Sequence, residues 1–308
     1  MVLLLAAAQL GAGDLTDLRR EFENPPVSYR PHTRWWWMGN ALRKADITYQ
    51  LDRMQEQGIG GVEQISMGPV FERGNVEFLS PEYFELLKHA VAEAGARKME
   101  FSVNFGGPGW IWGGEWVPKG FRSRNLVASA VDIEGPRSFE GELPLEVEQN
   151  PRNRTESLRR VRPEDEVVAV VAARVEDGRL AAGTLTELTG TVRGRRLRWQ
   201  APEGRWRLMA FWSVLNGEPA VDHLSRAAME FYCDYLGGRM RAAIGAEFGR
   251  TVESLFMDSF EVPVYRNGMY WTPEFPELFA RRRGYRLAKY LPARSEEHTS
   301  ELQSHLNL

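Results

Sequence analysis

The fold is decided by the stretch TRWWWMGNALRKADITYQLDRMQEQGIGGVEQIS, Thr33 to Ser66. The aromatic run TRWWWM at its start predicts a strand, and GVEQIS at its end predicts another. Between them Ile47, Leu51 and Met54 recur at helical spacing, and Gly58 ends that helix. The stretch therefore predicts a strand, a helix and a second strand in succession.

The same order repeats along the chain. A second helix begins after Ser80, which precedes a proline and is a favourable N-cap, and a strand follows over Met99–Phe105. Another helical pattern begins at Ser225 and leads into the apolar run SLFMDSFEVP, Ser254–Pro263. A further helix is expected after Thr272. Alternating strands and helices predict an α/β fold with a parallel sheet.

Such a sheet is either open and doubly wound or part of an eight-stranded barrel. Open sheets usually bind nucleotides, yet the glycine-rich stretch GGPGWIWGG has neither the GK[ST] ending of a phosphate loop nor the GxGxxG spacing. We therefore predict a partial (β/α)8 TIM-like barrel that contains its first four βα units.

A segment with the period of strands interrupts this pattern. In RWRLMAFWSV, Arg205–Val214, the side chains alternate with period two, and Asp177-Gly178 is typical of a hairpin turn. We predict an inserted antiparallel β domain. The expected segments are a leader or signal-peptide remnant at 1–21, the first part of the barrel at 22–124, the inserted domain at 125–220, the barrel continuation at 221–293 and a tail at 294–308.

Composition excludes several classes of function. With 308 residues and a net charge of −3, the chain has no electrostatic footprint for nucleic acid. A single cysteine, Cys233, excludes an internal disulfide and a cysteine-based zinc site, and its place on an apolar helical face predicts a core position. Beyond the leader, no apolar run approaches the roughly 20 residues of a membrane span.

Both ends of the chain have unusual sequences. MVLLLAAAQLGAG, Met1–Gly13, is similar to the apolar core of a secretory signal, so we expect a periplasmic or secreted protein. RSEEHTSELQSH, Arg294–His305, resembles the translation of a sequencing-library adapter. We therefore expect the natural sequence to be represented only up to Ala293, and the chain to be an N-terminal fragment.

Polar and aromatic residues gather where the predicted strands end. In a barrel, the carboxyl ends of the strands form the active face. Carboxylates, amides and indoles with little net charge suit a neutral polyhydroxylated ligand such as a sugar. The candidate site residues are Trp36, Trp37, Asn40, Glu63, Asn104, Trp110, Trp112, Asp258 and Glu261.

Each candidate also has a structural explanation. Neighbouring residues of a strand point to opposite faces, so at least one tryptophan of the 35–37 run must serve packing. Glu63 could bond only to backbone amides, GGPGWIWGG could be only a connector, and His223, which precedes a helix cap, is expected to be structural.

Asp258 and Glu261 raise the same choice, since they lie three positions apart and would face opposite sides of a regular strand. They could be a strand-end pair satisfied by helix caps. Alternatively, Glu261 is a proton donor whose pKa is raised by its aromatic surroundings, which are Phe260, Tyr265 and Trp271. Asp258 then orients it or binds a hydroxyl.

Several segments together resemble one family. FENPPVSYRPHTRWWWMGN, FGGPGWIWGGEWV, VDHLSRAAMEFY, DSFEV and YWTPEFPELFARRRGYRLAKYLPA occur in this order between Phe22 and Ala293. They are similar to glycoside hydrolase family 106, the α-L-rhamnosidases. The resemblance implies a barrel catalytic domain with accessory β domains, exported by bacteria that degrade plant polysaccharides. It also implies calcium-assisted, inverting hydrolysis of terminal α-L-rhamnosyl linkages in rhamnose-containing oligo- or polysaccharides.

On this resemblance Glu261 is the general acid, and the partner base is expected downstream of this chain. No calcium ligand is assigned. Inversion requires two carboxylates about 6.5–9.5 Å apart, so we expect this chain to be inactive by itself. Two rival hypotheses remain open: a barrel glycosidase for another sugar, and a non-catalytic carbohydrate-binding protein that uses the tryptophans.

Overall fold

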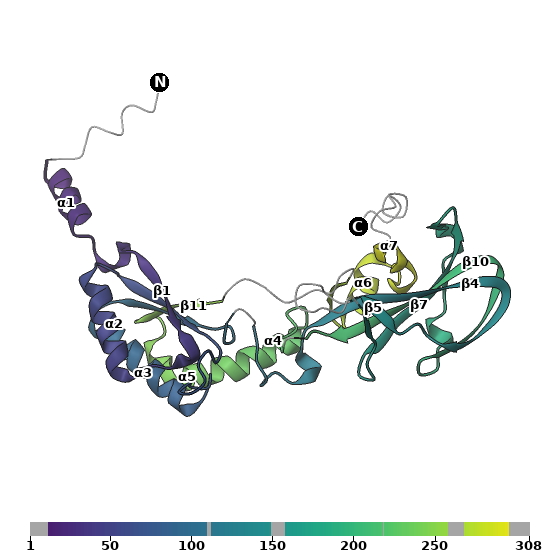
Figure 1. Ribbon diagram of the computed structural model, residues 1–308. Coiled ribbons are helices and arrows are strands. Elements are labelled where there is room, and N and C mark those ends of the chain that lie inside the picture. Colours follow the sequence, from purple (N-terminus) through teal and green to yellow (C-terminus); the bar gives the residue numbers. More distant parts are fainter. Residues whose placement is uncertain (1–11, 110–111, 149–157, 218, 258–267, 296–308) are drawn as a thin grey trace, which may run out of the picture. The chain divides into compact units, whose positions relative to one another are not determined.

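The computed structural model divides the chain into two compact units, which are described separately (Figure 1). Unit 1 consists of Met1–Gly114 and Tyr232–Phe260, and unit 2 of Glu115–Phe231 and Glu261–Leu308. The structure describes residues 12–109, 112–148, 158–217, 219–257 and 268–295.

Unit 1 contains a parallel sheet. Its strands are β1 (His32–Trp37), β2 (Gly61–Ser66), β3 (Glu100–Asn104) and β11 (Val252–Phe256), adjacent in that order. Every neighbouring pair is parallel, so the carboxyl ends of the four strands lie at one edge. The chain thus visits three neighbouring strands in succession and adds the fourth after its excursion through unit 2. The predicted α/β class is confirmed.

Helices cover one face of this sheet. Ser80 caps α3, as predicted, by accepting a hydrogen bond from the Tyr83 amide at 3.2 Å. Ile47 and Leu51, the predicted apolar stripe of α2, are fully buried. α3 packs against both α2 and α5 (Figure 1). The helices of unit 1 are α1 (Ala12–Glu23), α2 (Lys44–Glu56), α3 (Pro81–Ala96) and α5 (Gly238–Ile244), with short 3-10 turns at Val27–Tyr29, Met38–Asn40 and Gly245–Glu247.

Unit 2 is built on an antiparallel sheet in the order β12-β4-β10-β7-β8, with β9 also paired to β7. Asp177 and Gly178 both have positive φ and close the predicted hairpin between β7 and β8. A separate pair, β5 with β6, completes the strands. The bounds are β4 Arg124–Glu142, β5 Glu146–Glu148, β6 Leu158–Arg160, β7 Glu166–Glu176, β8 Arg179–Leu180, β9 Thr186–Glu187, β10 Arg196–Leu215 and β12 Met269–Trp271.

The central strand β10 is buried on both faces, because its two alternating sets of side chains enter different cores. Trp206, Leu208 and Trp212 belong to one apolar cluster. Met209 and Phe211 belong to the other. Burial of apolar side chains of this size contributes about 2 kcal/mol each, so β10 stabilises both cores of unit 2.

The predicted continuation of the barrel over 221–293 differs from the structure in its last part. β12 pairs with β4, and Trp271 is buried in the second apolar cluster of unit 2. Phe275 and Leu287 pack against the same cluster. These apolar side chains find their partner on the antiparallel sheet, which explains the difference. The remaining helices of unit 2 are α6 (Phe275–Arg283) and α7 (Pro292–Ser295), with 3-10 turns at Lys119–Phe121, Ala182–Thr184, Thr189–Thr191 and Ala288–Tyr290.

One helical run leads the chain from unit 2 into unit 1. It consists of α4 (Arg226–Tyr232), a π-helical turn (Cys233–Gly237) and α5. Tyr232 and Leu236 are buried, but Cys233 is exposed and the predicted core position is wrong. A π turn shifts the helical register, so spacing read at 3.6 residues per turn misplaces Cys233. Among the helices of the described residues, none has the length and apolarity needed to cross a membrane.

Candidate active site

The carboxyl edge of the parallel sheet in unit 1 is the place where the predicted site residues can meet. The register pairs Trp37 of β1 with Ser66 of β2, and Asn104 of β3 with Phe256 of β11. Ligands of parallel α/β sheets bind at this edge, in the loops that follow the strands. The structure therefore places the described strand-end residues of four neighbouring strands along one edge.

Trp36 and Trp37 lie on opposite faces at the end of β1. Trp36 is 41 % exposed, whereas Trp37 is 0 % exposed. The ring of Trp37 packs edge-on against Trp35 at 5.4 Å and against Tyr83 of α3 at 6.2 Å between centroids. Trp37 is thus enclosed between the sheet and α3, and only Trp36 presents surface to a ligand in this conformation.

Asn40 lies just past β1 with a φ of 49°, a left-handed conformation that asparagine tolerates better than most residues. Its Nδ2 donates to the Val76 carbonyl at 3.1 Å. Its Oδ1 is buried and has no hydrogen-bond partner among the described residues, and the same holds for Nε1 of Trp37. A buried acceptor without a partner costs about 1–3 kcal/mol, so a donor at Oδ1 would be favourable.

Asn104 at the end of β3 shapes its own loop. Its Oδ1 accepts from the Gly106 amide at 2.9 Å, and its Nδ2 donates to the Gly107 carbonyl at 3.1 Å. Both groups of the amide are thus engaged by the glycine-rich loop after β3. The geometry gives Asn104 a positioning role in the loop, while its predicted contact with a substrate stays a prediction.

Glu63 forms an ion pair on the face of the sheet away from Trp37. Its carboxylate lies 2.9 Å from Nε of Arg34, the residue paired with it in the β1–β2 register. The Arg34 guanidinium also lies over the Phe256 ring, 5.0 Å from its centroid. The three side chains link β1, β2 and β11 one layer below the strand ends. Glu63 is therefore more than a backbone acceptor, and its main partner is a cation.

Three predicted site residues, Trp110, Asp258 and Glu261, lie outside the described residues. Trp112 is described and half-buried in the loop after β3. Trp271, expected to surround the acid, is buried in the apolar core of unit 2. The structure thus brings together the strand-end residues of β1, β2 and β3, and leaves the acid pair as predictions.

Sequence reasoning missed a buried polar chain under this edge. Nε2 of Gln64 donates to Ser66 Oγ at 3.0 Å, and Ser66 Oγ donates to the Tyr83 hydroxyl at 3.3 Å. Burial raises the pKa of Tyr83 to about 12, so its phenol stays protonated at ordinary pH. The signal in the sequence was that Gln64 and Ser66 are two residues apart on a strand, so both polar side chains face the same side of the sheet.

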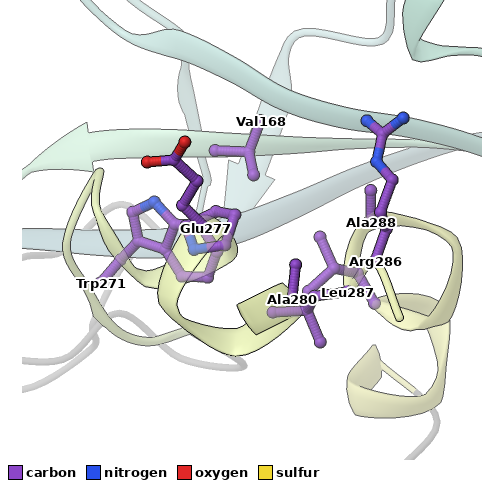
Figure 2. Close-up of a pocket in the computed structure, with 9 residues that line it drawn as sticks. Val168, Trp271, Glu277, Ala280, Arg286, Leu287 and Ala288 are labelled. Atoms are coloured by element: carbon purple, nitrogen blue, oxygen red, sulfur yellow. The ribbon is translucent and has the colours of Figure 1, made fainter. Parts of the chain in front are cut away.

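Unit 2 contains a groove of its own (Figure 2). It has a volume of about 330 Å³, and Arg286 at its rim pairs with Glu187 at 3.4 Å. Of the predicted site residues that the structure describes, none lines it. The lining residues are Val168, Trp271, Pro276, Glu277, Ala280, Arg286, Leu287, Ala288 and Leu291.

A metal centre built from charged or imidazole side chains needs several of them close together among the described residues. Within them, no group of three or more histidine, cysteine, aspartate or glutamate side chains is placed to hold a metal ion. The calcium implied by the family resemblance stays an expectation, and no step of the proposed chemistry depends on it.

Comparison with known proteins identifies the family. A family model described as alpha-L-rhamnosidase, that of glycoside hydrolase family 106, matches residues 23–178 and 163–298. The chain belongs to glycoside hydrolase family 106. The resemblance seen in the sequence motifs is confirmed.

Two similar proteins are longer than this chain. A putative beta-glucuronidase of Formosa agariphila is 24 % identical over 311 residues, which cover 91 % of this chain and 26 % of that protein. The solved structure of a rhamnosidase from Novosphingobium sp. PP1Y matches with a TM-score of 0.60 and 18 % identity, over 90 % of this chain and 42 % of that one. The second likeness shows a shared fold. The family 106 chain described here thus spans less than half of either protein.

Proposed function

We propose that this chain supplies the acid-bearing part of a glycoside hydrolase that removes terminal α-L-rhamnosyl residues from plant-type glycans. The observation that carries the proposal is the extent of the family match, which includes both the strand-end edge of unit 1 and the stretch with Glu261. The exposed ring of Trp36 at that edge offers an apolar wall for the C–H face of a sugar.

The proposed architecture is the start of a (β/α)8 barrel. Its support is the strand order, because the chain visits neighbouring parallel strands in sequence, as it would in a barrel. In that architecture Glu261 protonates the glycosidic oxygen, and a second carboxylate activates water on the opposite face of the sugar with inversion. We assign the second carboxylate to no residue of this chain, and we expect the 308-residue chain to bind the sugar without hydrolysing the linkage.

A neutral sugar is favoured over a uronic acid by one contact. The similarity to a putative beta-glucuronidase makes a uronic acid the second candidate substrate. Recognition of a uronate requires a cation that is available to its carboxylate. On the open face of the sheet, Arg34 already pairs with Glu63 at 2.9 Å, so a substrate carboxylate would compete with Glu63 for it. An uncharged deoxy-sugar would not compete with Glu63 for Arg34.

The test compares release of 4-nitrophenol from the α-L-rhamnoside and from the β-D-glucuronide. The assay is run on this chain and on any longer gene product that contains this sequence. In an active product, Glu261→Gln should lower the rate by at least about 100-fold while binding survives. Glu253→Gln, which changes an exposed acid of β11, should leave the rate unchanged. Turnover that does not depend on Glu261, or a preference for the glucuronide, would overturn the proposal.

A periplasmic or secreted location is part of the proposal, since polysaccharides are degraded outside the cytoplasm. Its support is the apolar leader seen in the sequence, which lies outside the described residues. Fractionation of cells that express the native gene tests it. Recovery of the protein only with cytoplasmic markers would contradict it.

A further inference from the structure

The loop between β2 and α3 holds an aromatic side chain at the carboxyl edge of the sheet. Phe71 is 53 % exposed, and its neighbour Val70 is also exposed. Single exposed apolar residues are common on protein surfaces and need no explanation by themselves. Phe71 differs because a side chain of the same loop, Asn75, fixes its backbone.

Asn75 fixes the backbone of residues 70 and 71. Its Oδ1 accepts hydrogen bonds from the amides of Val70 and Phe71, both at 3.1 Å. Its Nδ2 donates to the Phe71 carbonyl. One side chain thus occupies both amides and one carbonyl of this dipeptide, so the loop presents Phe71 in a defined position.

The same loop is attached to the end of β1. The Val76 amide donates to the Gly39 carbonyl at 2.9 Å, and Nδ2 of Asn40 donates to the Val76 carbonyl at 3.1 Å. Gly39 has a φ of 59°, and a Cβ built on it would lie 2.1 Å from Oδ1 of Asn75 and 3.4 Å from Cδ2 of Phe71. The ring of Phe71 therefore lies beside Gly39, three residues after Trp36.

We propose that Phe71 forms the wall of a second sugar subsite, against which the group attached to the rhamnosyl residue packs. This inference rests on the proposed function. Trp36 belongs to β1, and Phe71 lies beside Gly39, the third residue after Trp36, so both aromatic side chains belong to the segments at the carboxyl end of β1. The group that packs against Phe71 has a flat apolar face, either an aryl ring or the C–H face of a pyranose. Because the backbone that carries the ring is already fixed by Asn75, less conformational entropy is lost when such a group binds.

The experiment measures binding to the 308-residue chain by calorimetry, with four probes. They are L-rhamnose, methyl α-L-rhamnoside, 4-nitrophenyl α-L-rhamnoside and an α-L-rhamnosyl-D-glucose disaccharide. Phe71→Ala should leave the affinity for the first two unchanged and weaken binding of a probe with a flat face about threefold to tenfold. Tyr49→Ala is the matched control, because Tyr49 is an exposed aromatic residue on α2 of the same unit, and it should change neither.

The outcomes separate this inference from the function on which it rests. If the unaltered chain binds no rhamnoside, the sugar site itself fails. If it binds L-rhamnose and Phe71→Ala has no effect on any probe, the second subsite fails and the proposed function stands. An equal loss for L-rhamnose would place Phe71 at the rhamnosyl residue and overturn the inference. A loss confined to the aryl probe or to the disaccharide supports the subsite and identifies which flat face it accepts.

Discussion

Gly39→Ala tests how the end of β1 and the loop after β2 are joined. An alanine at a φ of 59° costs about 1 kcal/mol from backbone strain alone. Its Cβ would also lie 2.1 Å from Oδ1 of Asn75, so that side chain must move and release the amides of Val70 and Phe71. Two lost hydrogen bonds add about 1 kcal/mol each. The expected destabilisation of unit 1 is therefore about 3 kcal/mol.

The control for this substitution is Gly58→Ala. Gly58 also has a positive φ, 80°, but no atom lies within 4 Å of a Cβ built on it. It should therefore cost only the backbone strain, about 1 kcal/mol. Asn75→Ala supplies the second control. In the double variant with Gly39→Ala the clash is gone, so the double variant should be destabilised by less than the sum of the two single destabilisations.

Hydrogen exchange across a urea series, read on peptides of β1 and β2, reports the stability of unit 1 without contribution from unit 2. Peptides of the 67–79 loop should in addition exchange faster in Gly39→Ala than in Gly58→Ala. Equal destabilisation by the two alanines, with an unchanged loop, would refute the close packing of Gly39 against Asn75.

Three further predictions concern unit 2. Burial lowers the pKa of His223 from 6.5 to about 4, so the unfolded chain takes up its proton at a higher pH than the folded chain. The free energy of unfolding should therefore fall as the pH drops from about 6.5 to about 4, and His223→Gln should reduce that fall. Ser129→Ala should destabilise unit 2 by about 2 kcal/mol, because Ser129 Oγ accepts from Nε1 of the buried Trp212 at 2.7 Å. Asp132→Asn should lower the free energy of unfolding by about 1 kcal/mol or less at neutral pH. Hydrogen bonding to Arg207 lowers the Asp132 pKa, so the difference in stability between the variant and the unaltered protein should vanish as the pH falls through that pKa.

Each of these predictions is checked by thermal unfolding, with the variant compared against the unaltered protein or a control variant. For His223→Gln, the difference from the unaltered protein should be constant above pH 7, and a difference that stays constant down to pH 4 would contradict the prediction. Ser138→Ala removes an exposed serine that accepts from Gln200 at 3.1 Å, and it should cost far less than Ser129→Ala. The Asp132→Asn effect should shrink at high salt, and an effect that persists there would argue against an exposed ion pair.

Local signals in the sequence predicted much of unit 1. The stripe of Ile47 and Leu51 and the cap at Ser80 depend only on neighbouring residues, so their helices were predicted closely. The partner of Trp271 was not predictable, because an apolar strand and helix fit either sheet and only tertiary packing selects one. Cys233 was misplaced since nothing in the spacing indicates a π turn.

The candidate site shows the same limit. The alternation of the 35–37 run predicted that at least one tryptophan packs in the core, but the face covered by α3 decides that Trp37 is enclosed and Trp36 is exposed. Phe71 and Asn75 were missed because they lie in a loop without periodicity, and their role depends on the positive φ of Gly39 across the chain.

The central claim is that the carboxyl edge of the parallel sheet binds a rhamnosyl residue. A crystal of the chain soaked with L-rhamnose tests it directly. The account predicts density for the sugar at the ends of β1, β2 and β3, with one face against Trp36. Density confined to the groove lined by Trp271 and Arg286, or density nowhere on a crystal whose carboxyl edge is open to solvent, would contradict it.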